Sequence, residues 1–326
     1  MELIGHENTK KQLEVAIISA VERNTSLPHM LFAGAPGCGK TSMAHFVAKK
    51  LGYPFLSAIP NDMVDYKGVF SILENLNHDN YDDMGNRTGK ITPTILFFDE
   101  IHNMPLKGQE ILGIAMERFM VESGTPNKFL WTPRFTLVGA TTKPGTLSKP
   151  FRDRFKLNFT FEPYNVDDMC KIVKVHAKRE NIIILPSAVM AVAKRSRGTP
   201  RIAVRFVERV RDHMISSGSQ IATIPLVESM FSDMGIDGEG FTTTELKILR
   251  CLFDSRVPVG LDNLAIITEE DKKTIRDHIE PFLIRKGLIL VMSKGRILTE
   301  RGIEYIENFG TCKKTKKEIT FDYERT

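Results

Sequence analysis

The chain has 326 residues, 42% of them hydrophobic and 26% charged, a composition typical of globular proteins and a length sufficient for two or three domains. No apolar run approaches the roughly 18 residues of a membrane span and the first residues do not resemble a signal peptide, so a cytoplasmic location is expected. Four widely spaced cysteines predict neither a zinc site nor a disulfide framework, and a net charge of +5 spread along the chain does not by itself predict a partner.

A glycine-rich segment near the N-terminus has the pattern of a phosphate-binding loop, G-x-x-x-x-G-K-T at residues 34–41. Met30 to Ala33 predict a buried strand before it, and residues 41–51 carry apolar side chains near a helical period after it. The motif requires this context, because glycines let backbone N–H groups turn around an anion and the helix N-terminus adds further donors. The expected nucleotide contacts are Gly34, Ala35, Pro36, Gly37, Cys38, Gly39, Lys40, Thr41 and Ser42.

Two residues of this loop have separate expected roles. Lys40 reaches the β- and γ-phosphates, and the Thr41 hydroxyl binds Mg²⁺, so ATP and Mg²⁺ are the expected cofactors. Because Cys38 lies inside the loop, modification of its thiol is expected to block nucleotide binding.

Two carboxylates follow a second predicted strand. Ile95 to Phe98 form a continuous apolar run, typical of a parallel strand covered on both faces, and Asp99 and Glu100 come directly after it. Ligands bind at the carboxyl ends of such strands, so these carboxylates and the phosphate loop are expected at one edge. Asp99 is then placed to bind Mg²⁺, and Glu100 to orient and deprotonate the attacking water.

The segments around this strand carry further candidates. Residues 77–86 are rich in turn formers and predict an exposed loop. A third strand, Phe135 to Gly139, leads to Thr141 and Thr142, whose hydroxyls could meet the γ-phosphate or the water. Arg152 and Arg154 flank Asp153, and the residues alone favour a surface ion pair there.

Residues 162–237 predict a small helical domain. Asn165 or Asp167 caps a helix to about Arg179, and Pro186 opens a second. Thr199 and Pro200 begin a third helix, placing Arg201 in its first turn, where a cation opposes the helix dipole. The basic residues of this domain could bind DNA, but their helical spacing favours a solvated face; they are Lys194, Arg195, Arg197, Arg205, Arg209 and Arg211.

Residues 238–310 predict a winged helix. Thr242-x-x-Glu245 and Thr268-x-x-Asp271 look like capping boxes for two helices, the second kinked near Pro281, and a hairpin through Ser293-Lys294-Gly295 follows. A winged helix can bind DNA phosphates or another protein. The candidate DNA contacts are Lys272, Lys273, Arg276, Lys294 and Arg296. The basic tail, 311–326, is expected to be disordered, with nonspecific DNA contact as the alternative.

Several of these motifs together resemble the AAA+ ATPases and, among them, the RuvB family of bacterial Holliday-junction branch-migration motors. The resemblance follows the family's order along nearly the whole chain. It rests on the phosphate loop and on Asp99-Glu100-Ile101-His102, residues 138–142, 150–155, 197–203 and 258–265, with Lys294-Gly295-Arg296 matching the family's wing. It implies an α/β fold with three domains: an AAA+ P-loop parallel-sheet core (1–161), a helical lid (162–237) and a C-terminal winged helix (238–310).

The resemblance also implies residue roles. Thr142 matches the sensor that contacts the γ-phosphate within the subunit, with Thr141 a neighbouring candidate. Arg154 matches the arginine finger that reaches the ATP of the adjacent subunit, replacing the surface-pair interpretation and implying a ring, expected to be hexameric. Arg201 matches the second sensor, carried by the lid.

Three departures from the family pattern affect expectations. The chain starts at Leu3-Ile4-Gly5-His6, matching the family's Leu-x-Gly-Gln, without the preceding arm that helps to enclose adenine. The segment from Asn77 to Pro93 is longer than the family's, and residues 121–133, in place of the hairpin that binds the partner RuvA, are shorter. Trp131 lies there and either anchors an interface or packs under the hairpin.

The function implied is a Mg²⁺-dependent ATPase that moves duplex DNA and drives branch migration in recombination and repair. A clamp-loader subunit or replication-initiator loader is the nearest alternative. A protein-remodelling ATPase with a protein-binding winged helix is another, although Tyr66-Lys67-Gly68 is a poor match to an unfoldase pore loop. A protein that uses ATP only as a structural switch is disfavoured by the presence of Glu100 and Arg154.

Overall fold

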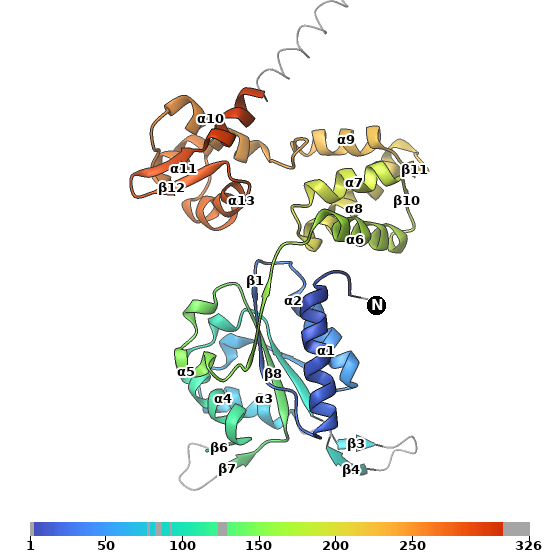
Figure 1. Ribbon diagram of the computed structural model, residues 1–326, viewed down its shortest axis with the longest axis vertical. Helices are drawn as coiled ribbons and strands as arrows, with labels where there is room; N and C mark the ends of the chain where they lie inside the picture. Colours follow the sequence, from blue (N-terminus) through green and yellow to red (C-terminus); the bar gives the residue numbers. More distant parts are fainter. Residues whose placement is uncertain (1–2, 77–78, 82–86, 92, 123–128, 309–326) are drawn as a thin grey trace, which may run out of the picture. The chain divides into compact units, whose positions relative to one another are not determined.

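The computed structural model describes residues 3–76, 79–81, 87–91, 93–122 and 129–308. The chain divides into two compact units, one ending at Val227 and one beginning at Glu228. This division falls inside the helix α9 (Ile224–Asp233), ten residues before the predicted boundary between the lid and the winged helix at 237/238. Each unit is described by itself (Figure 1).

A parallel sheet forms the centre of the first unit (Figure 1). Its strands, in spatial order, are β2 (Phe55–Ala58), β5 (Thr94–Phe98), β8 (Phe135–Thr141), β1 (Met30–Gly34) and β9 (Leu157–Phe161). All neighbouring pairs are parallel, so the carboxyl ends of β1, β5 and β8 meet at one edge. The predicted α/β class is therefore confirmed.

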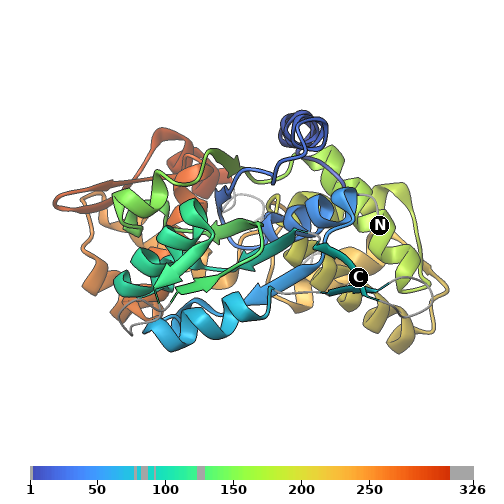
Figure 2. The same cartoon turned by 90° about the horizontal axis from the view of Figure 1, so that it is seen from below.

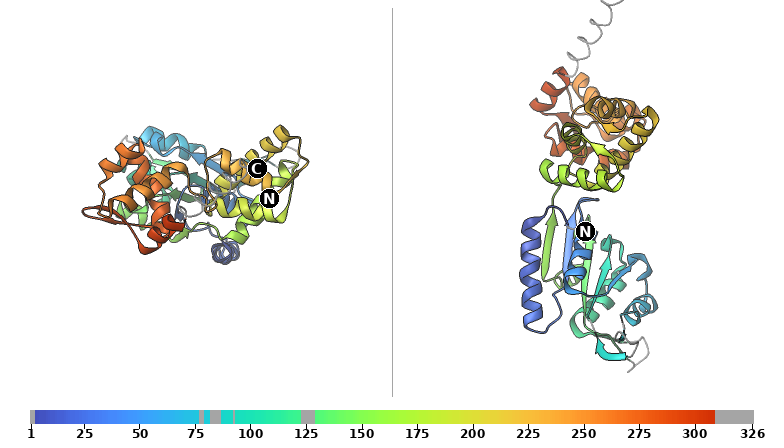
Figure 3. Two further views of the ribbon diagram at one scale, coloured as in Figure 1. Left: turned by 90° about the horizontal axis from the view of Figure 1, so that it is seen from above. Right: turned by 90° about the vertical axis from the view of Figure 1, so that its right-hand side faces the viewer.

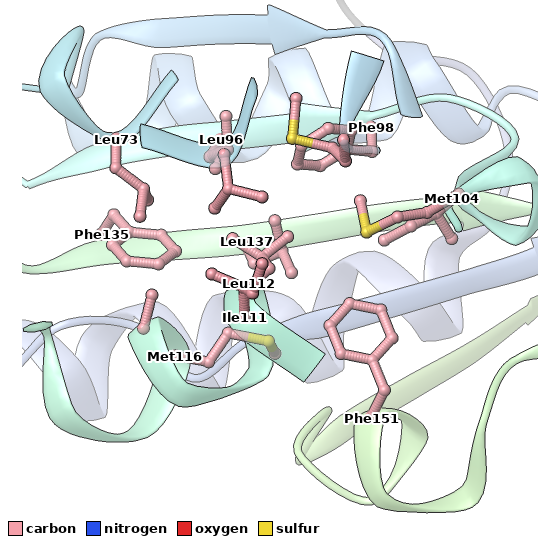
Figure 4. Close-up of a cluster of buried hydrophobic side chains, with 14 of the residues drawn as sticks. Leu73, Leu96, Phe98, Met104, Ile111, Leu112, Met116, Phe135, Leu137 and Phe151 are labelled. Carbon is pink, nitrogen blue, oxygen red and sulfur yellow. The ribbon is translucent and has the colours of Figure 1, made fainter. Parts of the chain in front are cut away.

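Both faces of this sheet are buried, because successive side chains of a strand point to opposite faces. Ile95 and Phe97 join a cluster with α1 (Glu7–Glu22) and α2 (Lys40–Leu51). Leu96 and Phe98 join the opposite cluster, drawn in Figure 4. The helices of that face are α3 (Tyr66–Glu74), α4 (Leu106–Arg118) and α5 (Lys149–Arg152).

These layers explain why the central strands β5 and β8 are continuous apolar runs in the sequence. Figure 2 and the right-hand view of Figure 3 show the strands between α1, in dark blue, and the light-blue helix α3. Every residue of β5 and β8 is buried. Short 3-10 turns, Pro60–Asp62, Ile101–Asn103 and Pro144–Thr146, lie in the connections.

Two small antiparallel hairpins extend from this unit. β3 (Asp79–Tyr81) pairs with β4 (Arg87–Ile91), so the predicted loop over residues 77–86 is wrong in part; its remaining residues lie outside the described ranges. β6 (Met120–Glu122) pairs with β7 (Phe129–Trp131). Trp131 is 69% exposed and does not pack beneath its hairpin.

The lid follows β9. Its helices are α6 (Val166–Arg179), α7 (Pro186–Arg195) and α8 (Pro200–Ser217), and β10 (Ile183–Ile184) pairs with β11 (Ile221–Ala222). Asn165, and not Asp167, is the cap of α6, because its side chain accepts the Asp168 N–H at 2.8 Å. Pro186 and Pro200 occupy the first turns of their helices, as predicted.

The second unit has helices packed on a wing hairpin (Figure 1). Its elements are α10 (Thr243–Ser255), α11 (Leu261–Thr268), α12 (Lys272–Thr274), a π-helical turn η4 (Ile275–Ile279), α13 (Glu280–Arg285), β12 (Ile289–Met292) and β13 (Gly295–Leu298). The Thr242–Glu245 capping box is present. The second predicted box is wrong, because Thr268 ends α11 and donates its hydroxyl proton to Leu264 O, while Asp271 alone caps α12.

The predicted kink near Pro281 takes the form of the π-turn. Proline has no N–H for the bond to the residue four positions back, and a wider turn before it accommodates its ring. Among the described residues, no helix has the length and apolarity needed to cross a membrane.

Candidate active site

The phosphate loop joins β1 to α2 at the carboxyl edge of the sheet, as predicted. Three of its residues need to be glycine. Gly37 and Gly39 have φ of +76° and +91°, a region costly for residues with a Cβ, and Gly39 is the N-cap of α2. A Cβ on Gly34 would overlap the carbonyl oxygen of Phe161 at the end of the adjacent β9.

Lys40 is buried within this loop, with 6% of its surface exposed. Its Nζ donates to the carbonyl oxygens of Gly34 at 2.8 Å and Ala35 at 3.0 Å. Burial lowers the pKa of Lys40, while the Glu100 and Asp99 carboxylates oppose that shift. An ammonium has three donors, so the charge is held at the loop with one donor left for a phosphate oxygen.

The two carboxylates after β5 lie beside the end of β8. Asp99 is exposed, and its Oδ1 accepts the N–H of Glu100 at 3.0 Å. Glu100 has φ of +46°, unusual for a residue with a side chain. Its Oε2 accepts both the N–H and the hydroxyl of Thr142, each at 3.1 Å. The carboxyl ends of β5 and β8 therefore lie together at one edge of the sheet, as predicted.

The two threonines of β8 differ. Thr141 is fully buried, and its Oγ1 accepts the Lys143 N–H at 3.0 Å. The same oxygen lies 3.0 Å from Nδ1 of His102. Thr141 therefore has no surface for a phosphate, whereas the partly exposed Thr142 does. His102 was not singled out in the sequence; its position three residues after Asp99 was the available signal.

The N-terminal segment contacts the phosphate loop through His6. Its Nε2 lies 2.9 Å from the Cys38 carbonyl oxygen, and its ring packs edge-on against Phe161 and Tyr164. Burial lowers the pKa of His6, so the neutral ring donates its Nε2–H to that carbonyl. Because the peptide bond between Cys38 and Gly39 is planar and trans, the N–H of Gly39 points in the direction opposite to the Cys38 carbonyl, away from His6.

The Cys38 side chain is 1% exposed and belongs to the core beneath the loop. Reagents therefore have no access to its thiol while the loop is folded. Burial opposes modification of this thiol in the folded loop, and the expectation that modification blocks nucleotide binding stays a prediction.

The lid contacts the phosphate loop. A Cβ on Gly37 would lie 2.9 Å from Thr199 Cγ2 and 3.2 Å from Arg201 Cβ. Arg201 lies in the first turn of α8 and is exposed. Its charge lowers the pKa of Lys40, the smallest of the influences on that residue. Arg201 and Lys40 thus form a basic pair around the loop, the position expected for a γ-phosphate sensor.

A cavity of about 400 Å³ lies beside the loop, between α2 and the lid. Its walls are largely apolar and include Leu3, Ile4, Phe46, Tyr164, Ile172 and Pro200. This volume suits a nucleoside. The residues that line this cavity are separated by almost 200 positions in the sequence, from Leu3 to Pro200.

Arg154 does not contact the phosphate loop of its own chain in the described residues. Its Nε lies 3.1 Å from Glu117 Oε1 without hydrogen-bond alignment, and its Nη1 donates to the Pro150 carbonyl. Its stem packs on Gly113, where a Cβ would lie 3.3 Å from Arg154 Cδ. α4 therefore holds this guanidinium with 24% of its side chain exposed.

The five candidate DNA contacts of the second unit differ in their surroundings. Lys273 and Lys294 are exposed and pair with no carboxylate in the part of the chain that the structure describes. Lys272 pairs with Asp262 at 2.8 Å and Arg276 with Asp277 at 3.0 Å, all on the surface. Arg296 forms a two-point ion pair with Glu280, at 2.6 and 3.2 Å, and Glu280 is only 4% exposed.

Comparisons with known proteins agree along the chain. Residues 1–161 match the "Holliday junction DNA helicase RuvB P-loop domain", 164–237 the "RuvB AAA lid domain" and 238–307 the "RuvB C-terminal winged helix domain". The chain is 37% identical to a Helicobacter pylori protein and 36% identical to a Streptococcus uberis protein, both named "Holliday junction branch migration complex subunit RuvB". These alignments cover 94% of this chain and 89% and 90% of the relatives.

Solved structures agree with the sequence relatives. The Thermotoga maritima RuvB Holliday junction branch migration motor is 33% identical, with a TM-score of 0.76 over 93% of this chain and 95% of that one. A point mutant of the same protein has a TM-score of 0.78 over 94% and 95%. The chain therefore belongs to the RuvB family of AAA+ ATPases.

Proposed function

We propose that this protein is an ATP-driven motor that branch-migrates Holliday junctions. The observation that carries the proposal is the gathering of Lys40, Glu100, Thr142 and Arg201 around one loop, in a family whose relatives bear that function in their names. In this mechanism the loop N–H groups and Lys40 bind the phosphates, and Glu100 deprotonates the attacking water. Arg201 links the lid to the γ-phosphate.

Mg²⁺ is part of the proposal because the residues fit it. Mg²⁺ is commonly held by one or two protein oxygens together with phosphates and water. Thr41 and Asp99 each offer an exposed oxygen ligand, and Asp99 keeps Oδ2 unused by its bond to the Glu100 N–H. The ion would shield phosphate charge as the transferred group departs.

Arg154 supports a shared active site in the proposed ring, expected to be hexameric. Its ion pair with Glu117 is partly exposed and worth about 0–1 kcal/mol, so a neighbouring γ-phosphate would displace Glu117 readily. The exposed Phe129 and Trp131 support a contact with a RuvA-like partner at the β6–β7 hairpin. A cytoplasmic location remains part of the proposal.

DNA would be held by the second unit, chiefly through Lys273 and Lys294. Lys272 and Arg276 can exchange their exposed partners for phosphates at small cost. Arg296 would instead position the wing, since releasing it would leave the buried Glu280 unpaired, at about 3–5 kcal/mol.

The test is dissociation of a synthetic four-way junction, by the protein alone and with RuvA, with and without ATP and across salt concentrations. ATP-dependent dissociation that is lost in Lys40→Ala is expected. ATP turnover without junction processing under any condition would remove the branch-migration function and leave the ATPase activity.

A further inference from the structure

His102 lies two residues after the proposed general base, in the 3-10 turn Ile101–Asn103 that follows β5. Its side chain is 14% exposed and lies between two strand ends. Its Nδ1 is 3.1 Å from Glu100 Oε2 and 3.0 Å from Thr141 Oγ1. One ring nitrogen thus faces both a carboxylate and a buried hydroxyl.

The position of the proton on this ring follows from its neighbours. If Nδ1 carried no proton, its lone pair would face the lone pairs of a carboxylate oxygen at 3.1 Å, which is repulsive. Nδ1 therefore carries the proton, which is directed to Thr141 Oγ1 in a hydrogen bond and lies in close electrostatic contact with Glu100 Oε2. The Thr141 oxygen, which also accepts the Lys143 N–H, holds this same ring nitrogen through its hydrogen bond.

Three polar groups then lie 3.1 Å from one oxygen of Glu100: the N–H and hydroxyl of Thr142, which donate hydrogen bonds to it, and Nδ1 of His102, which approaches it at ion-pair distance. No hydrogen bond in the described residues uses Oε1 of Glu100. The carboxylate is consequently oriented, with Oε2 held by the protein and Oε1 left to accept a proton from water.

We propose that His102 is a positioning residue for the general base, and that Thr141 orients His102 for this task. The inference rests on the proposed function, since it assigns Glu100 the role of base. Thr142 has a hydroxyl that must serve the γ-phosphate when ATP is bound, and His102 then remains as the side chain that holds Oε2. This gives the two adjacent threonines of β8 different roles.

Side-chain geometry provides matched variants. The amide nitrogen of asparagine occupies nearly the place of histidine Nδ1, whereas that of glutamine occupies nearly the place of Nε2. His102→Asn therefore keeps a donor at Oε2, while His102→Gln and His102→Ala do not. His213→Ala, on the exposed end of α8, is the control for loss of a histidine elsewhere.

The experiment measures kcat and KM for ATP in the full-length protein. His102→Ala and His102→Gln should lower kcat about 10- to 100-fold, the cost of misplacing a catalytic group, with KM within about threefold. His102→Asn should retain kcat within about threefold, and Thr141→Val should lower it about fivefold. Equal losses in His102→Asn and His102→Ala, or a changed KM with unchanged kcat, would overturn the proposal.

A double mutant separates this role from a structural one. In single-turnover hydrolysis of radiolabelled ATP, His102→Ala should leave the residual rate of Glu100→Gln unchanged within about twofold, because His102 acts through that carboxylate. The same fractional loss in both backgrounds would show that His102 acts elsewhere. Affinity for a fluorescent ATP analogue verifies that each variant is folded, and a His102→Ala protein unable to bind it would shift the role to folding.

ATP turnover is measured without a junction, and junction dissociation separately. A wild-type protein that hydrolyses ATP but processes no junction contradicts the branch-migration function alone, and the His102 variants then still decide the positioning role.

Discussion

His29 should make the first unit less stable in mild acid. Leu137 donates its N–H to Nδ1 of His29 at 2.8 Å, so that nitrogen is unprotonated, and Nε2–H donates to the Met116 carbonyl oxygen at 3.0 Å. Burial lowers the pKa of His29 below its ordinary value of 6.5. Protonation of Nδ1 would break the bond to β8 and place a charge inside the fold.

The sign follows from the lowered pKa. The unfolded chain takes up the proton near pH 6.5, before the folded one, so the stability contributed by neutral His29 is complete above that pH and is lost as the pH falls below it. One proton changes the free energy of unfolding by at most about 1.4 kcal/mol per pH unit. His6 and His176, whose pKa values burial also lowers, add to the slope in the same direction.

The assay is urea unfolding at pH 7.5, 6.5 and 5.5, followed by circular dichroism and by the fluorescence of Trp131, the only tryptophan, which lies in the first unit. His29→Gln keeps a donor and an acceptor but does not titrate, so its pH slope should be smaller than that of the wild type by up to about 1.4 kcal/mol per unit. His278→Gln, in the second unit, is the control. Equal slopes in wild type and His29→Gln would refute the assignment.

Three further outcomes are expected. Glu100→Gln should bind ATP yet hydrolyse it about 10²- to 10⁴-fold more slowly, and near-normal turnover would remove Glu100 from the mechanism. Arg154→Ala should regain activity when mixed with Lys40→Ala, which keeps its own finger; no recovery on mixing would argue against a shared site. Gly39→Ala should be destabilised by about 1–2 kcal/mol through its φ of +91° and further by its Cβ lying 2.7 Å from Tyr164 Oη. In a thermal melt, adding Tyr164→Phe should recover only the stability lost through the contact with Tyr164 Oη. If Tyr164→Phe recovers no stability, the clash is excluded.

The core elements that hold the site were predictable because their physical signals are local. A continuous apolar run implies a strand covered on both faces, and β5 is buried throughout. A polar side chain before an apolar period implies a helix start, and Asn165 and Thr242 act as caps. The phosphate loop was predictable from its own glycines and from the strand and helix on either side of it.

Features that depend on distant residues were not predictable. The strand β9, with alternating polar residues, gave no continuous apolar run, although it forms an edge of the sheet. The Arg296–Glu280 ion pair joins residues on two elements, and only the fold shows that this cation is already neutralised. The contact between His102 and Thr141 likewise crosses from one strand end to the next.

The ends of β1 and β9 lie side by side, and only a short connection separates them from the lid. Phe161, the last residue of the sheet, is in register with Gly34, the first of the phosphate loop. The lid begins four residues later at the Asn165 cap, and between them Tyr164 donates its N–H to the Gly198 carbonyl of the lid. Because this connection is so short, a small rotation of the lid about it would displace the far end of the lid much more than the segment beside the phosphate loop.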